Sequence, residues 1–160
     1  MSEPIPVALD PNKDFVIVCD AAKTSLGWTV LQKQENGNIH AVSYGGMATT
    51  ESQQKWTAAQ LEITAVAGAL KSFEPYFLQR KVIILSDNVS VLHFHKLQFA
   101  SPRERRIAVY FSRFNLHFKF IRAVHNLAAD SLSRAVEDMS EEEKSLSTAG
   151  YKKGPYLSMY

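Results

Sequence analysis

The sequence has few of the features that mark secreted or membrane proteins. Its 160 residues include one cysteine, Cys19, so no disulfide can form within the chain. No apolar run approaches the roughly 20 residues that a membrane-spanning helix needs. The start, Met1-Ser2-Glu3-Pro4, lacks the basic and apolar regions of a secretory signal. We therefore expect an intracellular protein, cytoplasmic or nuclear, with no membrane contact and with Cys19 buried in its core.

The composition predicts one globular domain, because 46% of the residues are hydrophobic and 21% are charged. Residues 1–13 carry three prolines and no periodicity, so we expect an extended N-terminal arm. The domain should cover residues 14–136. Residues 137–160 are polar and rich in Ser, Glu and Lys, which indicates an acidic, flexible tail.

Hydrophobic periodicity predicts an α/β fold. Strands are expected over residues 15–20, 26–34, 39–44, 81–86 and 116–122, and helices over 56–73, 88–97, 102–114 and 126–136. Met47 to Gln54 should form a polar loop, and Asn36-Gly37 is a strong signal for a hairpin turn. Three antiparallel strands followed by two helix-linked parallel strands indicate a five-stranded mixed sheet with helices on both faces.

Two of the apolar runs end in an aspartate. Phe15 to Cys19 leads into Asp20, and Lys81 to Ser86 leads into Asp87. A carboxylate at the end of a buried strand lies where an open α/β sheet binds its ligands. Between the two runs, Glu62 begins the apolar row of the helix expected over 56–73, so its side chain should point inward.

Each acid also has a structural interpretation. Asp20 could begin a turn, Asp87 could cap the next helix, and Asp130 could pair with Arg134 at i+4. Most helical glutamates face water, but an inward Glu62 would cost several kcal/mol unless it is partnered or protonated. Converging carboxylates repel one another unless a cation holds them together, so the joint pattern predicts a metal site.

The charge is unevenly distributed although the net charge is only +2. Between His93 and Arg122 there are seven basic residues and one acidic residue, and an acidic run follows at residues 137–143. A basic run is usually a solvated helix face. Beside an acidic cluster, it favours a polyanion held across a metal site.

Four segments together resemble the ribonuclease H domain that follows the reverse transcriptase of gypsy-type LTR retrotransposons. The closing segment, Asn126-Leu127-Ala128-Ala129-Asp130-Ser131-Leu132-Ser133-Arg134, is close to the family's Asn-x-x-Ala-Asp-Ala-Leu-Ser-Arg ending. The other three contain the remaining acids; they are residues 15–31, 60–73 and 80–87. The resemblance covers about Phe15 to Arg134 and implies an RNase H-like fold.

The resemblance implies that Asp20, Glu62, Asp87 and Asp130 are catalytic carboxylates that bind two Mg²⁺ ions, for which Mn²⁺ can substitute. It implies hydrolysis of the RNA strand of RNA–DNA hybrids, with RNA selected through its 2′-hydroxyl groups. A reverse transcriptase domain in the same polyprotein is an expected partner. His125 is a possible auxiliary residue, and the candidate nucleic-acid contacts are Asn88, Arg103, Arg105, Arg106 and Asn126.

The chain departs from the family pattern at three alanines. Ala22 replaces the usual serine, and Ala58 and Ala59 stand where the family carries Thr or Asn that hydrogen-bond nucleic acid. Neither Ala58 nor Ala59 has a side-chain donor. This leaves a second hypothesis, a catalytically inactive, domesticated module that binds nucleic acid or a protein partner. An integrase or transposase fits less well, because those enzymes place their glutamate late in the chain, whereas Glu62 precedes Asp87.

Overall fold

The computed structural model describes residues 9–35, 37–88 and 101–122, together with residues 124, 132, 134 and 136. Most of the helices expected over 88–97 and 126–136 lies outside the described residues, as do His125, Asn126 and Asp130. Residues 1–8 of the expected arm and the whole tail, 137–160, lie outside them too. Within the described ranges, no helix is long and apolar enough to cross a membrane.

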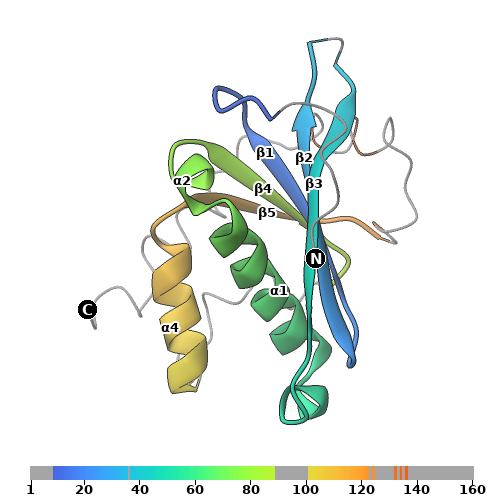
Figure 1. Cartoon of the computed structure of the whole chain (residues 1–160), viewed down its shortest axis with the longest axis vertical. Coiled ribbons are helices and arrows are strands. Elements are labelled where there is room, and N and C mark those ends of the chain that lie inside the picture. The colour runs from blue at the N-terminus through green and yellow to red at the C-terminus, as the bar shows by residue number, and fades with distance from the viewer. Residues whose placement is uncertain are drawn as a thin grey trace.

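A five-stranded mixed sheet forms the centre of the molecule, in the order β3-β2-β1-β4-β5 (Figure 1). Its strands are β1 (Phe15–Ala21), β2 (Ser25–Lys33), β3 (Ile39–Ala48), β4 (Lys81–Ser86) and β5 (Asn115–Phe120). The β1–β2 and β2–β3 pairs are antiparallel, whereas β1–β4 and β4–β5 are parallel. The predicted sheet is therefore confirmed. Strand β1, whose side chains are apolar on both faces of the sheet, lies at its centre.

The β2–β3 hairpin turns at the predicted position. Gly37 has a φ of +87°, which a glycine adopts without strain. Its N–H donates to the Gln34 carbonyl over 2.9 Å, and the Gln34 N–H donates to the Asn38 carbonyl over 2.7 Å. The prediction that β3 ends at Tyr44 was wrong, because pairing with β2 continues to Ala48 through two glycines that show no hydrophobic alternation.

The main helix, α1 (Ala58–Ser72), starts two residues after its predicted start because Thr57 caps it. The Thr57 hydroxyl accepts from the Gln60 N–H, and the Gln60 side chain accepts from the Thr57 N–H. The short helix α2 (Glu74–Phe77) follows, with Pro75 in its first turn. Part of the expected polar loop is the 3₁₀ helix η1 (Gln53–Lys55), and α4 (Pro102–Phe111) begins at the predicted proline.

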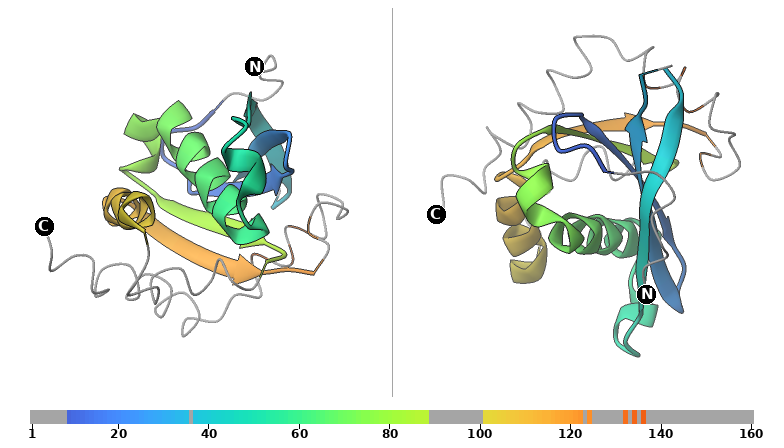
Figure 2. Two further views of the ribbon diagram at one scale, coloured as in Figure 1. Left: turned by 90° about the horizontal axis from the view of Figure 1, so that it is seen from below. Right: turned by 45° about the horizontal axis from the view of Figure 1, so that its top comes forward.

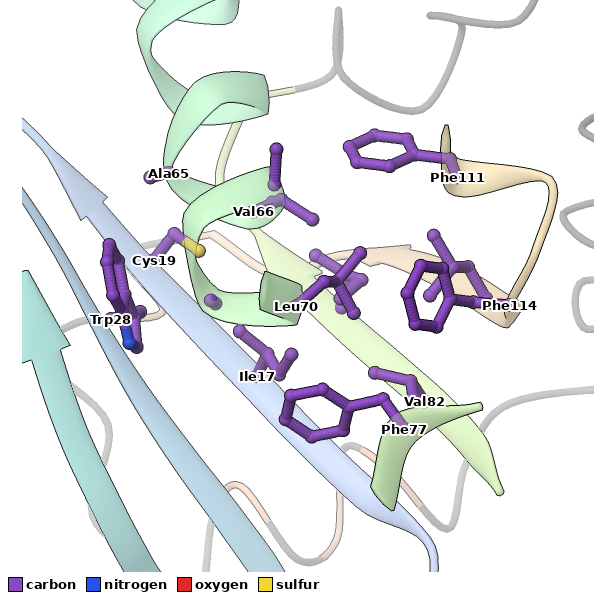
Figure 3. Close-up of a cluster of buried hydrophobic side chains, with 14 of the residues drawn as sticks. Ile17, Cys19, Trp28, Ala65, Val66, Leu70, Phe77, Val82, Phe111 and Phe114 are labelled. Carbon is purple, nitrogen blue, oxygen red and sulfur yellow. The ribbon is translucent and has the colours of Figure 1, made fainter. Parts of the chain in front are cut away.

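Both faces of the sheet are covered. The helices α1, α2 and α4 lie on one face, over a core that includes Ile17, Leu70, Phe77 and Phe111 (Figures 2 and 3). A smaller cluster covers the other face; its buried members are Val16, Leu31, Ile39, Ile83, Leu85, Val124 and Leu132, with Val136 packed against it. Leu132 and Val136, two helical residues of the last predicted helix, therefore lie on this second face.

Candidate functional site

The parallel pairing of β1 with β4 brings two of the predicted acids to one edge of the sheet. The paired register ends with Val18 level with Leu85, and Asp20 and Asp87 each follow two residues later. Both aspartates are exposed. The carboxyl ends of neighbouring parallel strands form the edge at which α/β sheets bind ligands. The sequence therefore placed Asp20 and Asp87 correctly at the same end of the sheet.

Glu62 reaches this edge from the first turns of α1. The capped start of the helix fixes its rotation, and Glu62 shares the sheet-facing side with Val66 and Ala69, as its spacing predicted. The side chain is only 5% exposed. A cavity of about 170 Å³ lies where the three acids meet; it is lined by Cys19, Asp20, Ala21, Ala58, Glu62, Asp87 and Asn88.

The buried carboxyl of Glu62 is incompletely satisfied. Its Oε1 atom has no hydrogen-bond partner among the described residues. Burial raises the pKa of Glu62 from an ordinary 4.5 to about 7, the Ser86 hydroxyl lowers it, and the charges of Asp87 and Asp20 raise it further. A buried oxygen with no partner, facing two more carboxylates, is an arrangement that a bound cation would stabilise.

The structural interpretations of the two aspartates are only partly supported. Backbone bonds close the turn after Asp20, because the Ala22 N–H donates to the Ser25 carbonyl over 2.9 Å. After β4, the hydroxyl of Ser86 accepts from the Asn88 N–H over 3.0 Å, which is the bond expected of a cap at Ser86. This role of Ser86 was not predicted, although a serine directly before Asp87 at the end of an apolar strand was a usable signal.

The three carboxylates share a cavity without forming a ready-made ligand set. No three Asp, Glu, His or Cys side chains are grouped to hold a metal ion in the part of the chain that the structure describes. Asp130, the fourth predicted ligand, lies outside that part. The donor chemistry nevertheless fits a hard divalent cation, since oxygen ligands from carboxylates are what Mg²⁺ prefers. The fit depends above all on the unpartnered Oε1 of Glu62.

Cys19 lies beside the acids as the buried thiol that the sequence predicted, with 1% of its surface exposed. Burial raises its pKa well above the ordinary value, and the charges of Glu62 and Asp20 raise it further. A thiol kept protonated in this way is a poor nucleophile. Cys19 therefore forms part of the cavity wall, and the charged groups that line the cavity are the carboxylates.

The predicted nucleic-acid residues occupy different positions. Asn88 lines the cavity, and Arg106 is exposed on α4. Arg105 is half-buried on the same helix. Arg103 packs within the protein: its guanidinium lies 3.7 Å from the centre of the Trp56 ring and donates a hydrogen bond to the Thr64 hydroxyl. The phosphate contacts predicted for these arginines stay a prediction.

Replacing Arg103 with alanine should destabilise the protein by about 2 kcal/mol, since the substitution removes a cation–π contact and a hydrogen bond. Burial lowers the pKa of Arg103, which agrees with a partly desolvated guanidinium. Arg106→Ala, an exposed position on the same helix, should change stability by no more than about 0.5 kcal/mol. Urea unfolding of both variants checks this, and equal stabilities would show that the Trp56 contact is unimportant.

Comparison with known proteins identifies the family. Residues 10–114 match the model of the RNase H-like domain found in reverse transcriptase. The chain belongs to this family. The resemblance to RNase H domains of gypsy-type retrotransposons is thus confirmed, and the matched range contains Asp20, Glu62 and Asp87 and ends before Asp130.

Curated relatives include two Pol polyproteins of Drosophila melanogaster transposons. The chain is 29% identical over 132 residues to the retrovirus-related Pol polyprotein from transposon 297, covering 82% of this chain and 12% of the polyprotein. It is 26% identical over 125 residues to the retrovirus-related Pol polyprotein from transposon 412, and this match covers 78% of this chain and 10% of the polyprotein. The chain therefore spans about a tenth of the length of these relatives.

Solved structures share the fold at low identity. The foamy viral protease-reverse transcriptase in complex with RNA/DNA hybrid aligns with a TM-score of 0.58 and 16% identity, over 74% of this chain and 17% of that one. LC11-RNase H1, isolated from compost, aligns with a TM-score of 0.50 and 17% identity. The alignment covers 75% of this chain and 92% of LC11-RNase H1. These similarities support the RNase H-like architecture described above.

Proposed function

We propose that this chain is a metal-dependent endonuclease that hydrolyses the RNA strand of RNA–DNA hybrids, as the ribonuclease H part of a retrotransposon Pol polyprotein. The observation that carries the proposal is the cavity at the carboxyl edge of β1 and β4. There, the buried and partly unsatisfied carboxyl of Glu62 faces Asp20 and Asp87. Family membership supports it, since the matched model describes an RNase H-like domain of reverse transcriptases.

Asp20, Glu62 and Asp87 would hold the metal, joined by Asp130 from the closing motif. The chemistry that bound Mg²⁺ would supply there is activation of a water molecule and stabilisation of the leaving oxygen in phosphodiester hydrolysis. The fold positions the carboxylates. The pairing of β1 with β4 sets the separation of the two aspartates, and the capped helix α1 holds Glu62 beneath them. The exposed aspartates leave the cavity open to a phosphate on the side facing solvent.

The proposed partners are an RNA–DNA hybrid and a reverse transcriptase domain in the same polyprotein. The relatives from transposons 297 and 412 are Pol polyproteins, and the chain covers about a tenth of each. One similar structure was determined with an RNA/DNA hybrid bound. Basic residues of α4, the exposed Arg106 among them, would contribute phosphate contacts, which supply most of the affinity for nucleic acids but little sequence preference.

A second candidate is a domesticated module that binds nucleic acid without cleaving it. The observation in its favour is Ala58, which lines the cavity with no side-chain donor to offer a substrate. The presence of Glu62 argues against this candidate. A buried carboxyl with an unpartnered oxygen would destabilise the fold if the protein never bound a cation.

The decisive experiment is a cleavage assay on matched RNA–DNA, RNA–RNA and DNA–DNA duplexes with Mg²⁺ or Mn²⁺. We expect cleavage of the RNA strand of the hybrid alone, and its loss in Asp87→Asn. Glu51→Gln is the control, because Glu51 is exposed on the loop before α1 and does not line the cavity. An intact hybrid with either metal, at high protein concentration and low salt, would instead favour the binding module.

A further inference from the structure

A cavity outside the candidate active site lies at the opposite end of the sheet, where β1 and β4 begin. It measures about 610 Å³, and its floor includes Val16, Ile39 and Ile83. Six charged side chains surround it: the basic Lys13, Lys33, Arg80 and Lys81, and the acidic Asp14 and Glu35. We call this cavity the basic groove, because four of the charged side chains around it are positive and two are negative.

Hydrogen bonds hold one rim of the basic groove in place. The fully buried Gln32 accepts from the Asp10 N–H over 2.9 Å and donates to the Asp10 carbonyl over 2.7 Å. Arg80 donates to the Pro11 carbonyl over 3.0 Å and to the Asn12 side chain over 3.2 Å. The rim is therefore a built feature of the fold, and a ligand would not have to order it.

The second face of the sheet shows where the chain enters the groove. Leu132 lines a cavity of about 410 Å³ that also contains Asp20 at the candidate active site. Val136, four residues later, lines the basic groove at the other end. Val136 therefore lies nearer the basic end of this face than Leu132 does. The residues that follow are strongly acidic; they are Glu137, Asp138, Glu141, Glu142 and Glu143.

We propose that the acidic segment, residues 137–143, docks in the basic groove of its own chain. The charges are complementary, and Val136 already brings the chain to the groove. Glu141 lies five residues beyond Val136, a separation of roughly 8 Å in a helix and up to roughly 17 Å extended. Exposed ion pairs contribute only about 0.2–1 kcal/mol each, so the docking depends on several pairs together and weakens in salt.

Docking would fix the segment that follows Asp130. This consequence depends on the proposed function, because it assigns Asp130 to the metal site. A chain anchored at both Leu132 and the acidic segment would present Asp130 at the catalytic edge with less conformational freedom. The acidic segment would then be a positioning element, and the basic groove its receptor.

Zero-length carbodiimide cross-linking of the full chain, followed by mass spectrometry, tests the docking. We expect amide cross-links from residues 141–143 to Lys13, Lys33 or Lys81, and about fivefold fewer in 1 M NaCl, where the screening length falls to about 3 Å. The other described lysines, Lys23, Lys55, Lys71 and Lys119, serve as internal controls. A Glu137→Gln, Asp138→Asn double variant keeps the reactive carboxylates at 141–143 and removes two charges of the segment, so it should form fewer groove cross-links while retaining its fold.

Cross-links spread evenly over the control lysines, or no cross-links from residues 141–143, would overturn the proposal. Cross-links found only between isotopically distinct copies in a mixed sample would also overturn it, because the occupant would then be a second molecule. The experiment uses neither metal nor nucleic acid. A negative result would therefore leave the nuclease proposal untouched, and an inactive nuclease would leave the docking untouched.

Discussion

Glu62→Gln should abolish metal-dependent cleavage and at the same time stabilise the metal-free protein at neutral pH. A catalytic metal supplies several kcal/mol of transition-state stabilisation, and each 1.36 kcal/mol is a factor of ten in rate, so the loss should be about 10³-fold or more. The opposite effect on stability follows from the cavity, where Glu62 is 5% exposed and its Oε1 has no partner among the described residues.

The stability effect has a defined pH window. The pKa of Glu62 is raised from 4.5 in an ordinary setting to about 7 in the folded protein. Between these values the folded state binds more protons than the unfolded state, so wild-type stability falls as the pH rises from 4.5 to 7. The loss attributable to Glu62 is on the order of 3 kcal/mol above pH 7. Glutamine carries no charge but leaves a buried amide, so the net gain should be about 1–2 kcal/mol.

Urea unfolding of wild type and Glu62→Gln in chelator, from pH 4.5 to 8, measures this difference. Subtracting the two curves removes the titrations that the proteins share. Glu51→Gln, an exposed change on the loop before α1, should leave both stability and cleavage unchanged. Mg²⁺ should stabilise the wild type and Glu51→Gln but not Glu62→Gln. The account of a buried carboxyl would be contradicted if the difference in stability between the wild type and Glu62→Gln were the same at pH 8 as at pH 5.

Trp28→Ala should have the largest effect on stability, about 3–5 kcal/mol, which is typical of a large aromatic removed from a core. The indole fits a slot between two glycines. A Cβ atom on Gly45 would lie 2.3 Å from its Nε1, and one on Gly68 would lie 2.9 Å from its Cζ3. Figure 3 shows Trp28 beside Cys19 within the main core. Such a closely enclosed site cannot collapse readily around the vacated volume.

Tyr44→Ala is the matched control for Trp28→Ala. Tyr44 is an aromatic residue on the neighbouring strand, but 39% of its surface is exposed, so its removal should cost less than about 1 kcal/mol. Denaturant unfolding monitored by circular dichroism serves both variants. Similar losses for Trp28→Ala and Tyr44→Ala would show that the glycine slot does not determine the stability of this region.

The sequence predicted the fold well because its strands have unambiguous patterns. The run from Phe15 to Asp20 is apolar on both alternations, and only a central strand covered on both faces uses such a pattern. The inward orientation of Glu62 followed from the 3.6-residue period alone. The length of β3 could not be predicted in this way, since Gly45 and Gly46 pair with β2 but contribute no side-chain pattern. A side chain at Gly45 would collide with the Trp28 ring, and one at Gly46 with the Leu26 carbonyl oxygen.

The candidate site was predictable in its acids but less so in their surroundings. The positions of Asp20 and Asp87 follow from two strands that end at the same edge of the sheet. The packing of Arg103 on Trp56 joins residues 47 positions apart, and no local pattern reports such a contact. The shift of α1 to Ala58 depended on whether Thr57 caps the helix or continues it, a choice settled by its hydrogen bonds with Gln60.

Titration with Mn²⁺, followed by electron paramagnetic resonance, tests most directly whether these carboxylates form a metal site. We predict saturable binding to the wild type, and affinities at least about tenfold lower in Asp20→Asn, Glu62→Gln and Asp87→Asn, as for the loss of groups around a metal site. The exposed control Glu51→Gln should bind like the wild type. No saturable binding, or equal affinity in all five proteins, would contradict the account.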